Sequence, residues 1–205
     1  MPDPDLFDEA SGEFLALADY RDDFAAREAA GRGQASWKLE RRQVFREPGN
    51  ESWEAFARGD WSEALRLAEQ RRGSLAEYQA TVDAQRNTLY RVRVVEEPIA
   101  PYLQWELNLL RVRAEVGENI RIIGPEKIAD RERIAALPEL ITLGSHTLYK
   151  IVYTDEGVLD GGIRITDPES VAKVTELAEE LYRGGEEIDS FFERRVAHLP
   201  PPKLE

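Results

Sequence analysis

The stretch LYRVRVVEEPIAPYLQWELNLLRVRAEVGENIRIIG, residues 89–124, decides the fold. Its first nine residues are rich in β-branched and aromatic side chains and contain no breaker, which predicts a strand that stops before Pro98. The next segment, residues 99–116, has leucines at helical spacing and is followed by Gly117, which predicts an amphipathic helix. NIRIIG, residues 119–124, predicts a second strand. Because a helix separates the two strands, we expect them to pair in parallel.

The flanking segments extend this unit into a larger mixed sheet. SWKLERRQVF, residues 36–45, alternates in the manner of a half-exposed strand, and residues 51–86 have a helical pattern that is interrupted twice. Beyond them the chain predicts three strands, the last two joined by a hairpin turn at Asp155-Glu156-Gly157, and then a closing helix: residues 139–144, 147–154, 158–166 and 167–185. The expected fold class is α/β, with a single mixed β-sheet flanked by helices.

The same pattern divides the chain into three parts. We expect an acidic N-terminal segment with a helix, an α/β domain with a helical insertion, and a C-terminal tail: residues 1–35, 36–185 (insertion 51–86) and 186–205. The tail contains the aromatic pair Phe191 and Phe192 before a proline-rich end. These rings are interaction candidates, because they either fold back onto the domain or form a docking patch for a partner.

Composition limits the functions that are open to the chain. Its 40 acidic and 27 basic residues give a formal charge of −13, which repels nucleic-acid backbones and anionic membranes. No apolar run approaches the length of a membrane-spanning helix. The absence of cysteine excludes disulfides and thiol catalysis and fits a cytoplasmic location. We therefore expect no direct contact with nucleic acid or with a membrane.

Signals for cofactors and metals are also missing. The two histidines, His146 and His198, have no partner at metal-ligand spacing. No glycine-rich loop precedes a helix in the arrangement that cradles phosphates, because Gly161-Gly162 precedes a strand. The sequence predicts neither a cofactor nor a metal ion.

Arg91 and Arg93 lie two residues apart on a predicted strand, so their side chains point to the same face of the sheet. If helices cover that face, at least one guanidinium group is partly buried and requires a partner. Glu106, on the following helix, is the expected partner. Two interpretations stay open: a structural ion pair, or a pocket for an anion or carboxylate near the carboxyl end of the strand.

LYKIVYTDEGVLDGGIRITD, residues 148–167, resembles the catalytic motif of the phospholipase D superfamily, His-x-Lys-x-x-x-x-Asp followed by small residues. In that superfamily the histidine attacks phosphorus, and the lysine offsets charge on the phosphoryl oxygens. Lys150 and Asp155 occupy the Lys and Asp positions, but Leu148 occupies the position of the nucleophile. His146 stands two residues too early and is the alternative candidate. The resemblance implies a phospholipase-D-like fold whose catalytic histidine is lost or displaced.

YRVRVVEEPIAPYLQWEL and GENIRII resemble a family of actinomycete proteins that is known only as a domain of unknown function. Its members share an Arg-x-Arg-Val-Val-x-x-Pro segment, a Tyr and a Glu in the next helix, and Gly-Glu-x-Ile-Arg. The matching positions are Arg91, Arg93, Pro98, Tyr102, Glu106, Gly117, Glu118 and Arg121. The resemblance carries over no catalytic residue. The candidate ligand-binding residues are Arg91, Arg93, Tyr102, Glu106 and Arg121.

The resemblance also implies a regulatory role, because genes of that family often lie near helix-turn-helix regulators. We expect a non-catalytic protein that acts with such a regulator and not on DNA itself, since an acidic surface can mask a basic partner. A homodimer stays open as an assembly. Two alternative functions also stay open: a phosphodiesterase or nuclease of the phospholipase D type, and a sensor of a small anionic ligand.

Overall fold

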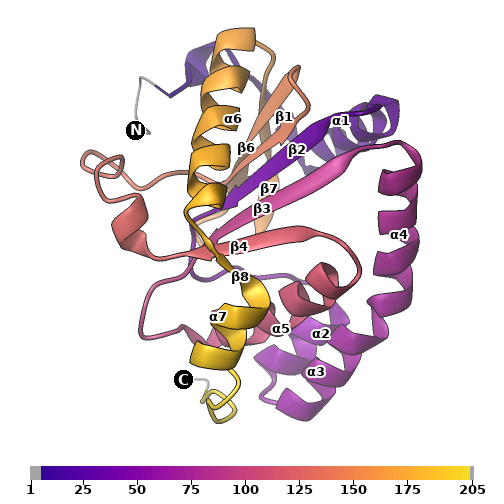
Figure 1. Cartoon of the computed structure of the whole chain (residues 1–205), viewed down its shortest axis with the longest axis vertical. Helices are drawn as coiled ribbons and strands as arrows, with labels where there is room; N and C mark the ends of the chain where they lie inside the picture. Colours follow the sequence, from indigo (N-terminus) through magenta and orange to yellow (C-terminus); the bar gives the residue numbers. More distant parts are fainter. Residues whose placement is uncertain (1–5, 204–205) are drawn as a thin grey trace.

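The computed structural model describes residues 6–203, which form a single eight-stranded sheet of mixed direction with helices on both faces (Figure 1). The strands lie in the order β1-β7-β6-β5-β2-β3-β4-β8. Their bounds are Glu13–Ala16 (β1), Ala35–Glu40 (β2), Thr88–Val94 (β3), Asn119–Ile123 (β4), Leu140–Leu143 (β5), Thr147–Tyr153 (β6), Leu159–Ile165 (β7) and Glu186–Glu187 (β8). The expected α/β class with one mixed sheet is confirmed.

Four of the seven helices within residues 6–203 lie in connections between strands that are neighbours in the sheet. Their bounds are Leu17–Ala30 (α1), Glu51–Ala57 (α2), Trp61–Gln70 (α3), Arg72–Ala84 (α4), Pro101–Glu115 (α5), Pro168–Arg183 (α6) and Ile188–Arg195 (α7), with short 3-10 turns at Glu9–Ser11 and Pro125–Lys127. β2, β3 and β4 are parallel, as the strand-helix-strand pattern predicted. α2, α3 and α4 connect β2 to β3, and α5 connects β3 to β4.

The second half of the sheet is antiparallel. β5, β6 and β7 follow one another beside β2, and the turn between β6 and β7 lies at the predicted position. Gly157 in this turn has a φ of +85°, a conformation that favours glycine because a side chain would be strained there.

The edge strand β1 was not predicted, because four residues give too little alternation to be recognised. It pairs with β7, where Gly161 and Gly162 lie opposite Ala16 and Leu15. A Cβ atom at Gly161 would lie 2.2 Å from the carbonyl oxygen of Leu15, and one at Gly162 would lie 2.8 Å from Cδ2 of Tyr20. The two glycines therefore allow both β1 and the following helix α1 to approach the sheet.

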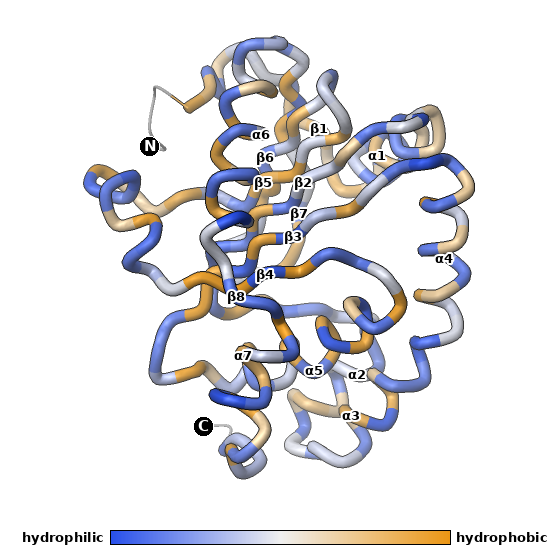
Figure 2. The backbone as a smooth tube through the Cα atoms, viewed as in Figure 1, coloured by the Kyte–Doolittle hydropathy of each residue, from blue (hydrophilic) through white to orange (hydrophobic). Residues whose placement is uncertain are grey.

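Helix α6 covers one face of the sheet and lies across it in Figure 1. Its apolar side packs on residues of the strands to form one part of the core, which includes Leu39, Val92, Leu148, Ile165, Val174 and Leu177. Along α6 and α4 hydrophobic and hydrophilic residues alternate, as expected of helices with one buried side (Figure 2). Among residues 6–203, no helix is both long and apolar enough to cross a bilayer.

Two separate helical groups cover the opposite face. α1 packs through Tyr20 on Leu143, Tyr149 and Ile151 of the antiparallel half. α5 packs on β4 and is itself covered by α3 and α7, so that most of its residues are buried. The strands between these two groups, β2 and β3, carry charged residues on this face, which decides where the candidate site lies.

The C-terminal segment differs from the expected tail. Residues 186–203 begin with β8, which pairs with β4, and continue as α7. Phe191 and Phe192 are 7% and 6% exposed and pack in the core beside α5. Of the two alternatives for these rings, they fold back onto the domain, because apolar residues at helical spacing give α7 a buried side. They form no exposed docking patch.

Replacing Phe192 by alanine should lower the free energy of unfolding by about 3–5 kcal/mol, because it leaves a cavity between α7 and α5. Phe14→Ala is the matched control, since Phe14 is 55% exposed and its loss should cost less than about 0.5 kcal/mol. Urea unfolding followed by circular dichroism measures both values. Equal effects of the two substitutions would contradict the packing of α7 on α5.

Candidate ligand-binding cleft

Charged side chains occupy the centre of the face that α1 and α5 cover. Arg91 of β3 contacts two carboxylates: its Nη1 lies 2.6 Å from Oε2 of Glu40, and its Nε lies 2.6 Å from Oε1 of Glu118. Glu40 also pairs with Lys38 at 2.6 Å, and Glu118 pairs with Arg113 at 3.1 Å. Side chains from β2, β3, α5 and the residue before β4 therefore form one continuous network of ion pairs.

Arg93 extends this network toward α5. The residue is fully buried, and its Nε donates to Oε2 of Glu106 at 2.8 Å, so Glu106 is the partner of Arg93. The hydroxyl of Tyr102 donates to Glu47 at 2.7 Å and lies 3.2 Å from Glu106. Four of the predicted ligand-binding residues are thus brought together. We refer to Lys38, Glu40, Arg91, Arg93, Glu106, Arg113 and Glu118 as the buried network.

Burial and the neighbouring cations have opposite effects on the pKa values of the carboxyl groups in the buried network. Burial raises the pKa of Glu40, but the positive charges of Arg91 and Lys38 outweigh it and hold that pKa below its usual range. The pKa of Glu118 is lowered in the same way, because Arg91 and Arg113 outweigh burial. Glu40 and Glu118 are therefore held in their charged form by the cations beside them, whereas burial outweighs Arg93 at Glu106 and raises the pKa of that carboxyl group.

A cleft of about 970 Å³ opens beside the buried network. Lys38, Glu40 and Arg91 contribute to its lining from the sheet, and Tyr102 and Glu106 contribute from α5. Further lining comes from the first turns of α1, from the loop after β2 and from the junction of α3 and α4. The cleft thus lies between the two helical groups, above the strands that neither group covers with apolar side chains.

The charge of this cleft differs from that of the whole chain, whose formal charge is −13. Six cationic and four carboxylate side chains line it: Arg21, Lys38, Arg46, Arg71, Arg91, Arg113, Glu40, Glu47, Glu51 and Glu106. An excess of cations inside a cleft attracts anions and concentrates them there, even on an acidic protein.

Three cations of the cleft stand outside the ion pairs of residues 6–203. The side chains of Arg21, Arg46 and Arg71 form no hydrogen bond and no ion pair with any residue between 6 and 203. Arg21 belongs to α1, Arg46 lies in the loop after β2, and Arg71 joins α3 to α4. We refer to these three residues as the free arginines, because their donors remain available to a ligand.

Arg71 is the most enclosed of the free arginines. It is half-buried, and burial together with the nearby positive charge of Arg113 lowers its pKa, while Glu47 opposes the shift. A guanidinium group that lacks water on one side and faces a like charge is stabilised when an anion binds to it. The cleft therefore contains an unsatisfied binding group, in contrast to the paired arginines of its floor.

The cleft also has apolar lining. Phe45 and Tyr153 contact each other with ring centroids 4.9 Å apart, and both line it together with Leu109 and Leu110. Apolar surface with a few converging polar groups is typical of small-molecule sites. The arrangement can hold an anion that carries an organic part.

The structure places the remaining predicted residues elsewhere. Arg121 lies opposite Val92 on β3, so it points to the α6 face and not to the cleft. Its guanidinium group lies over the ring of Tyr182, with 5.2 Å between Cζ and the ring centroid, and pairs with Glu187 at 2.5 Å. Arg121 is therefore separated from the other four candidates by the sheet.

The residues of the phospholipase-D-like motif do not form a cluster of reactive groups. Leu148 is fully buried beneath α6, and Lys150 pairs with Glu9 at 2.6 Å. Asp155 is exposed in the turn between β6 and β7, and His146 is exposed in the turn between β5 and β6. Gly161-Gly162, the small residues of the pattern, have a packing role against β1 and α1.

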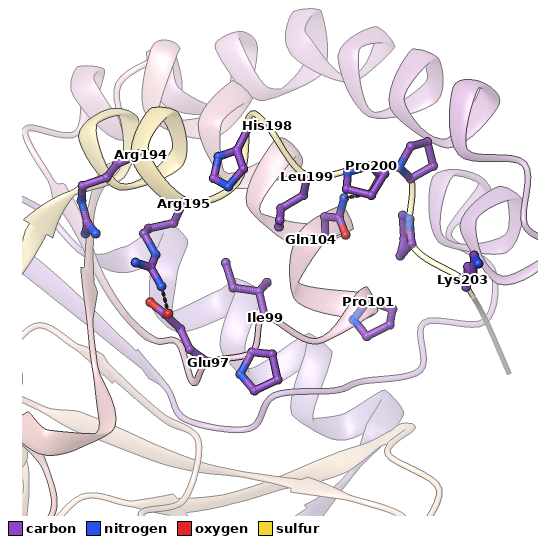
Figure 3. A pocket seen from close by; sticks show the side chains of 13 residues that line it. Glu97, Ile99, Pro101, Gln104, Arg194, Arg195, His198, Leu199, Pro200 and Lys203 are labelled. Carbon is purple, nitrogen blue, oxygen red and sulfur yellow. Dashed lines mark hydrogen bonds and ion pairs between the residues drawn. The ribbon is translucent and has the colours of Figure 1, made fainter.

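A second pocket, of about 790 Å³, lies between the start of α5 and the C-terminal segment (Figure 3). Ile99 and Leu199 belong to its lining, and Arg195 on its side is paired with Glu97. The side chain of Gln104 donates to the carbonyl oxygen of Pro200 at 2.7 Å. Because these polar groups find partners within the chain, we place the candidate site in the first cleft.

The sequence pointed to the floor of the cleft but not to its free arginines. The signal for Arg91, Arg93 and Glu106 was the presence of charge on elements that must be buried. Arg21, Arg46 and Arg71 belong to exposed or half-exposed segments, where an arginine is ordinary. Their common property, the absence of a partner, is visible only in three dimensions.

Glu139, next to Glu40, gives a test of the electrostatics beneath the cleft. Burial and the charge of Glu40 raise the pKa of Glu139 to about 7, although Arg93 and the backbone N–H groups of Arg41 and Arg42 oppose this. Between pH 4.5 and pH 7, Glu139 is therefore ionised in the unfolded chain but still protonated in the folded chain. The free energy of unfolding falls as the pH rises through this range.

Between pH 4.5 and pH 7.5, the unfolding free energy of the wild-type chain should fall by about 2–3 kcal/mol more than that of the Glu139→Gln variant. The glutamine keeps an oxygen that accepts from the two backbone N–H groups but does not titrate. Urea unfolding of both chains at several pH values gives this difference. A difference that stays constant over the range would show that Glu139 does not titrate near neutrality.

Comparison with known families agrees with part of the resemblance read from the sequence. The chain belongs to the DUF6879 family, described as a domain of unknown function, whose model matches residues 22–193. The match begins within α1 and ends within α7, so it includes the whole buried network and two of the free arginines. No curated protein matches the chain.

Proposed function

We propose that this member of the DUF6879 family is a non-catalytic regulatory protein that binds a small anionic ligand in the cleft. The observation that carries the proposal is the set of free arginines: three guanidinium groups from three separate elements line one cleft and have no partner among residues 6–203. Arg71 is the half-buried member of the set, whereas Arg21 and Arg46 are exposed at the rim of the cleft. An anion that binds to Arg71 offsets the cost of its partial burial and accepts charge-assisted hydrogen bonds from the other two.

The floor of the cleft supports binding better than catalysis. Arg91 and Glu106 each have a partner within the buried network, which leaves them as fixed groups and not as reactive ones. A floor whose charged groups are already held in ion pairs can position a ligand without exchanging protons with it. The rival function, a phosphodiesterase of the phospholipase D type, has less support because Leu148 is buried at the position of the nucleophile.

The regulatory part of the proposal rests on the surface outside the cleft. The exposed residues of α6 include Glu169, Glu176 and Glu180, and the chain carries a formal charge of −13. Such a surface complements a basic partner, and the partner that we propose is a helix-turn-helix regulator whose DNA-binding side is basic. The ligand would then change how strongly the chain holds that regulator.

The tagged chain can be purified from its host at increasing salt, with mass spectrometry of the bound proteins. A helix-turn-helix regulator that is released as the salt concentration rises would support an electrostatic partnership. A chain that returns alone at low salt would overturn this part of the proposal and leave the ligand-binding part untouched.

Anions should raise the melting temperature of the chain through the free arginines. The expected result is stabilisation by at least one of phosphate, sulfate, citrate and acetate, equivalent to about 2.7 kcal/mol at 100 times the dissociation constant. Arg71→Gln should weaken the response at least tenfold in apparent affinity. Differential scanning fluorimetry measures both effects, and circular dichroism checks that the variant is folded.

Arg183→Gln is the matched control for that experiment. Arg183 is exposed at the end of α6 and lies outside the cleft, so the substitution removes the same charge without touching the site. Anion binding that both variants lose equally would mean that only net charge matters. Without stabilisation by any anion of the panel, the proposed function fails.

A further inference from the structure

We infer that the ligand of the cleft is an organic phosphate, bound through one phosphoryl group by Arg21, Arg46 and Arg71 and through its organic part by the apolar lining. This inference rests on the proposed function and narrows it to one chemical class. Three observations lead to it: the number of free arginines, the carboxylates beside them, and the size and apolar lining of the cleft.

The number of free arginines favours phosphate over carboxylate. A carboxylate has two oxygens in one plane, and a single guanidinium group satisfies both with two parallel hydrogen bonds. A terminal phosphoryl group has three acceptor oxygens in a tetrahedral arrangement and a charge of about −1.5 to −2 at neutral pH. It can therefore accept from arginines of α1, of the loop after β2 and of the α3–α4 junction together, whereas a carboxylate offers these three groups fewer oxygens, in one plane, and a smaller negative charge.

The carboxylates near the free arginines limit the charge of the ligand. Glu47 and Glu51 line the cleft beside Arg46, and Glu47 is close enough to act on the pKa of Arg71. These acidic groups repel any further phosphoryl group of a di- or triphosphate. They can instead accept hydrogen bonds from hydroxyl or amino groups. The lining therefore fits a monoester better than a polyphosphate.

The size of the cleft indicates an organic part. Its volume of about 970 Å³ far exceeds the space that one phosphoryl group needs, and Phe45, Leu109 and Leu110 give it apolar lining. Apolar lining of this kind buries carbon atoms of a ligand and adds to the affinity. Inorganic phosphate should therefore bind, but more weakly than a phosphate ester of suitable shape.

Matched pairs of ligands test the class directly. Isothermal titration of the full chain uses phenyl phosphate against benzoate, glucose 6-phosphate against glucuronate, and inorganic phosphate against acetate. We expect the phosphate of each pair that binds to be at least tenfold tighter than its carboxylate, and at least one ester to be tighter than inorganic phosphate. Adenosine triphosphate should bind no more tightly than adenosine monophosphate.

Single substitutions identify the residues involved. Arg21→Gln, Arg46→Gln and Arg71→Gln should each weaken phosphate binding at least fivefold, whereas Arg183→Gln should change it less than twofold. If carboxylates bind as tightly as phosphates, or if only one of the three arginines matters, the organic-phosphate inference is wrong while the anion-binding function stands. If no probe binds in any titration, both fail.

Discussion

The two guanidinium groups of Arg91 and Arg93 lie beneath helices in the middle of the sheet, and charge at that depth requires an opposite charge nearby. Glu40 supplies it from β2, Glu106 from α5, and Glu118 from the turn before β4. The pair of Arg93 and Glu106 ties α5 to the centre of the sheet, because each charge requires the other at that depth. Removing one member of such a buried pair typically costs about 3–5 kcal/mol, whereas the intact pair adds little net stability. The network thus serves to fix one arrangement of the elements more than to raise the stability of the fold.

The position of the cleft follows from the same constraint. The apolar side of a helix can cover a sheet only where the residues of the sheet are apolar. On this face, two regions are apolar: the antiparallel half, which α1 covers, and β4, which α5 covers. Lys38, Glu40 and Arg91 interrupt the apolar surface between those regions. The two helical groups therefore stop on either side of the charged strands, and their edges form the walls of the cleft. A polar floor with separate walls thus results from charge in the strands, and the loop after β2 completes the lining.

The sequence predicted the elements whose pattern is local. The strand-helix-strand unit, the turn at residues 155–157 and the shared face of Arg91 and Arg93 depend on spacing within a few residues, and they appear as expected. Arg121 could not be placed in this way. Its face depends on the register between β3 and β4, which sets Arg121 opposite Val92, and a shift of one residue would have turned it toward the face that α5 covers. The free arginines depend on contacts between segments that are distant in the chain, which no local pattern records.

Gly161 and Gly162 link the N-terminal segment to the cleft. Only the missing side chains at these two positions let β1 and Tyr20 lie against β7, and α1, which follows β1 directly, brings Arg21 to the cleft. A family member with larger residues at both positions would have to move α1 away from the sheet, and its cleft would open on that side. Two adjacent glycines that do not line the cleft thus become a marker in sequence comparisons, separating relatives that can hold α1 against the sheet from those that cannot.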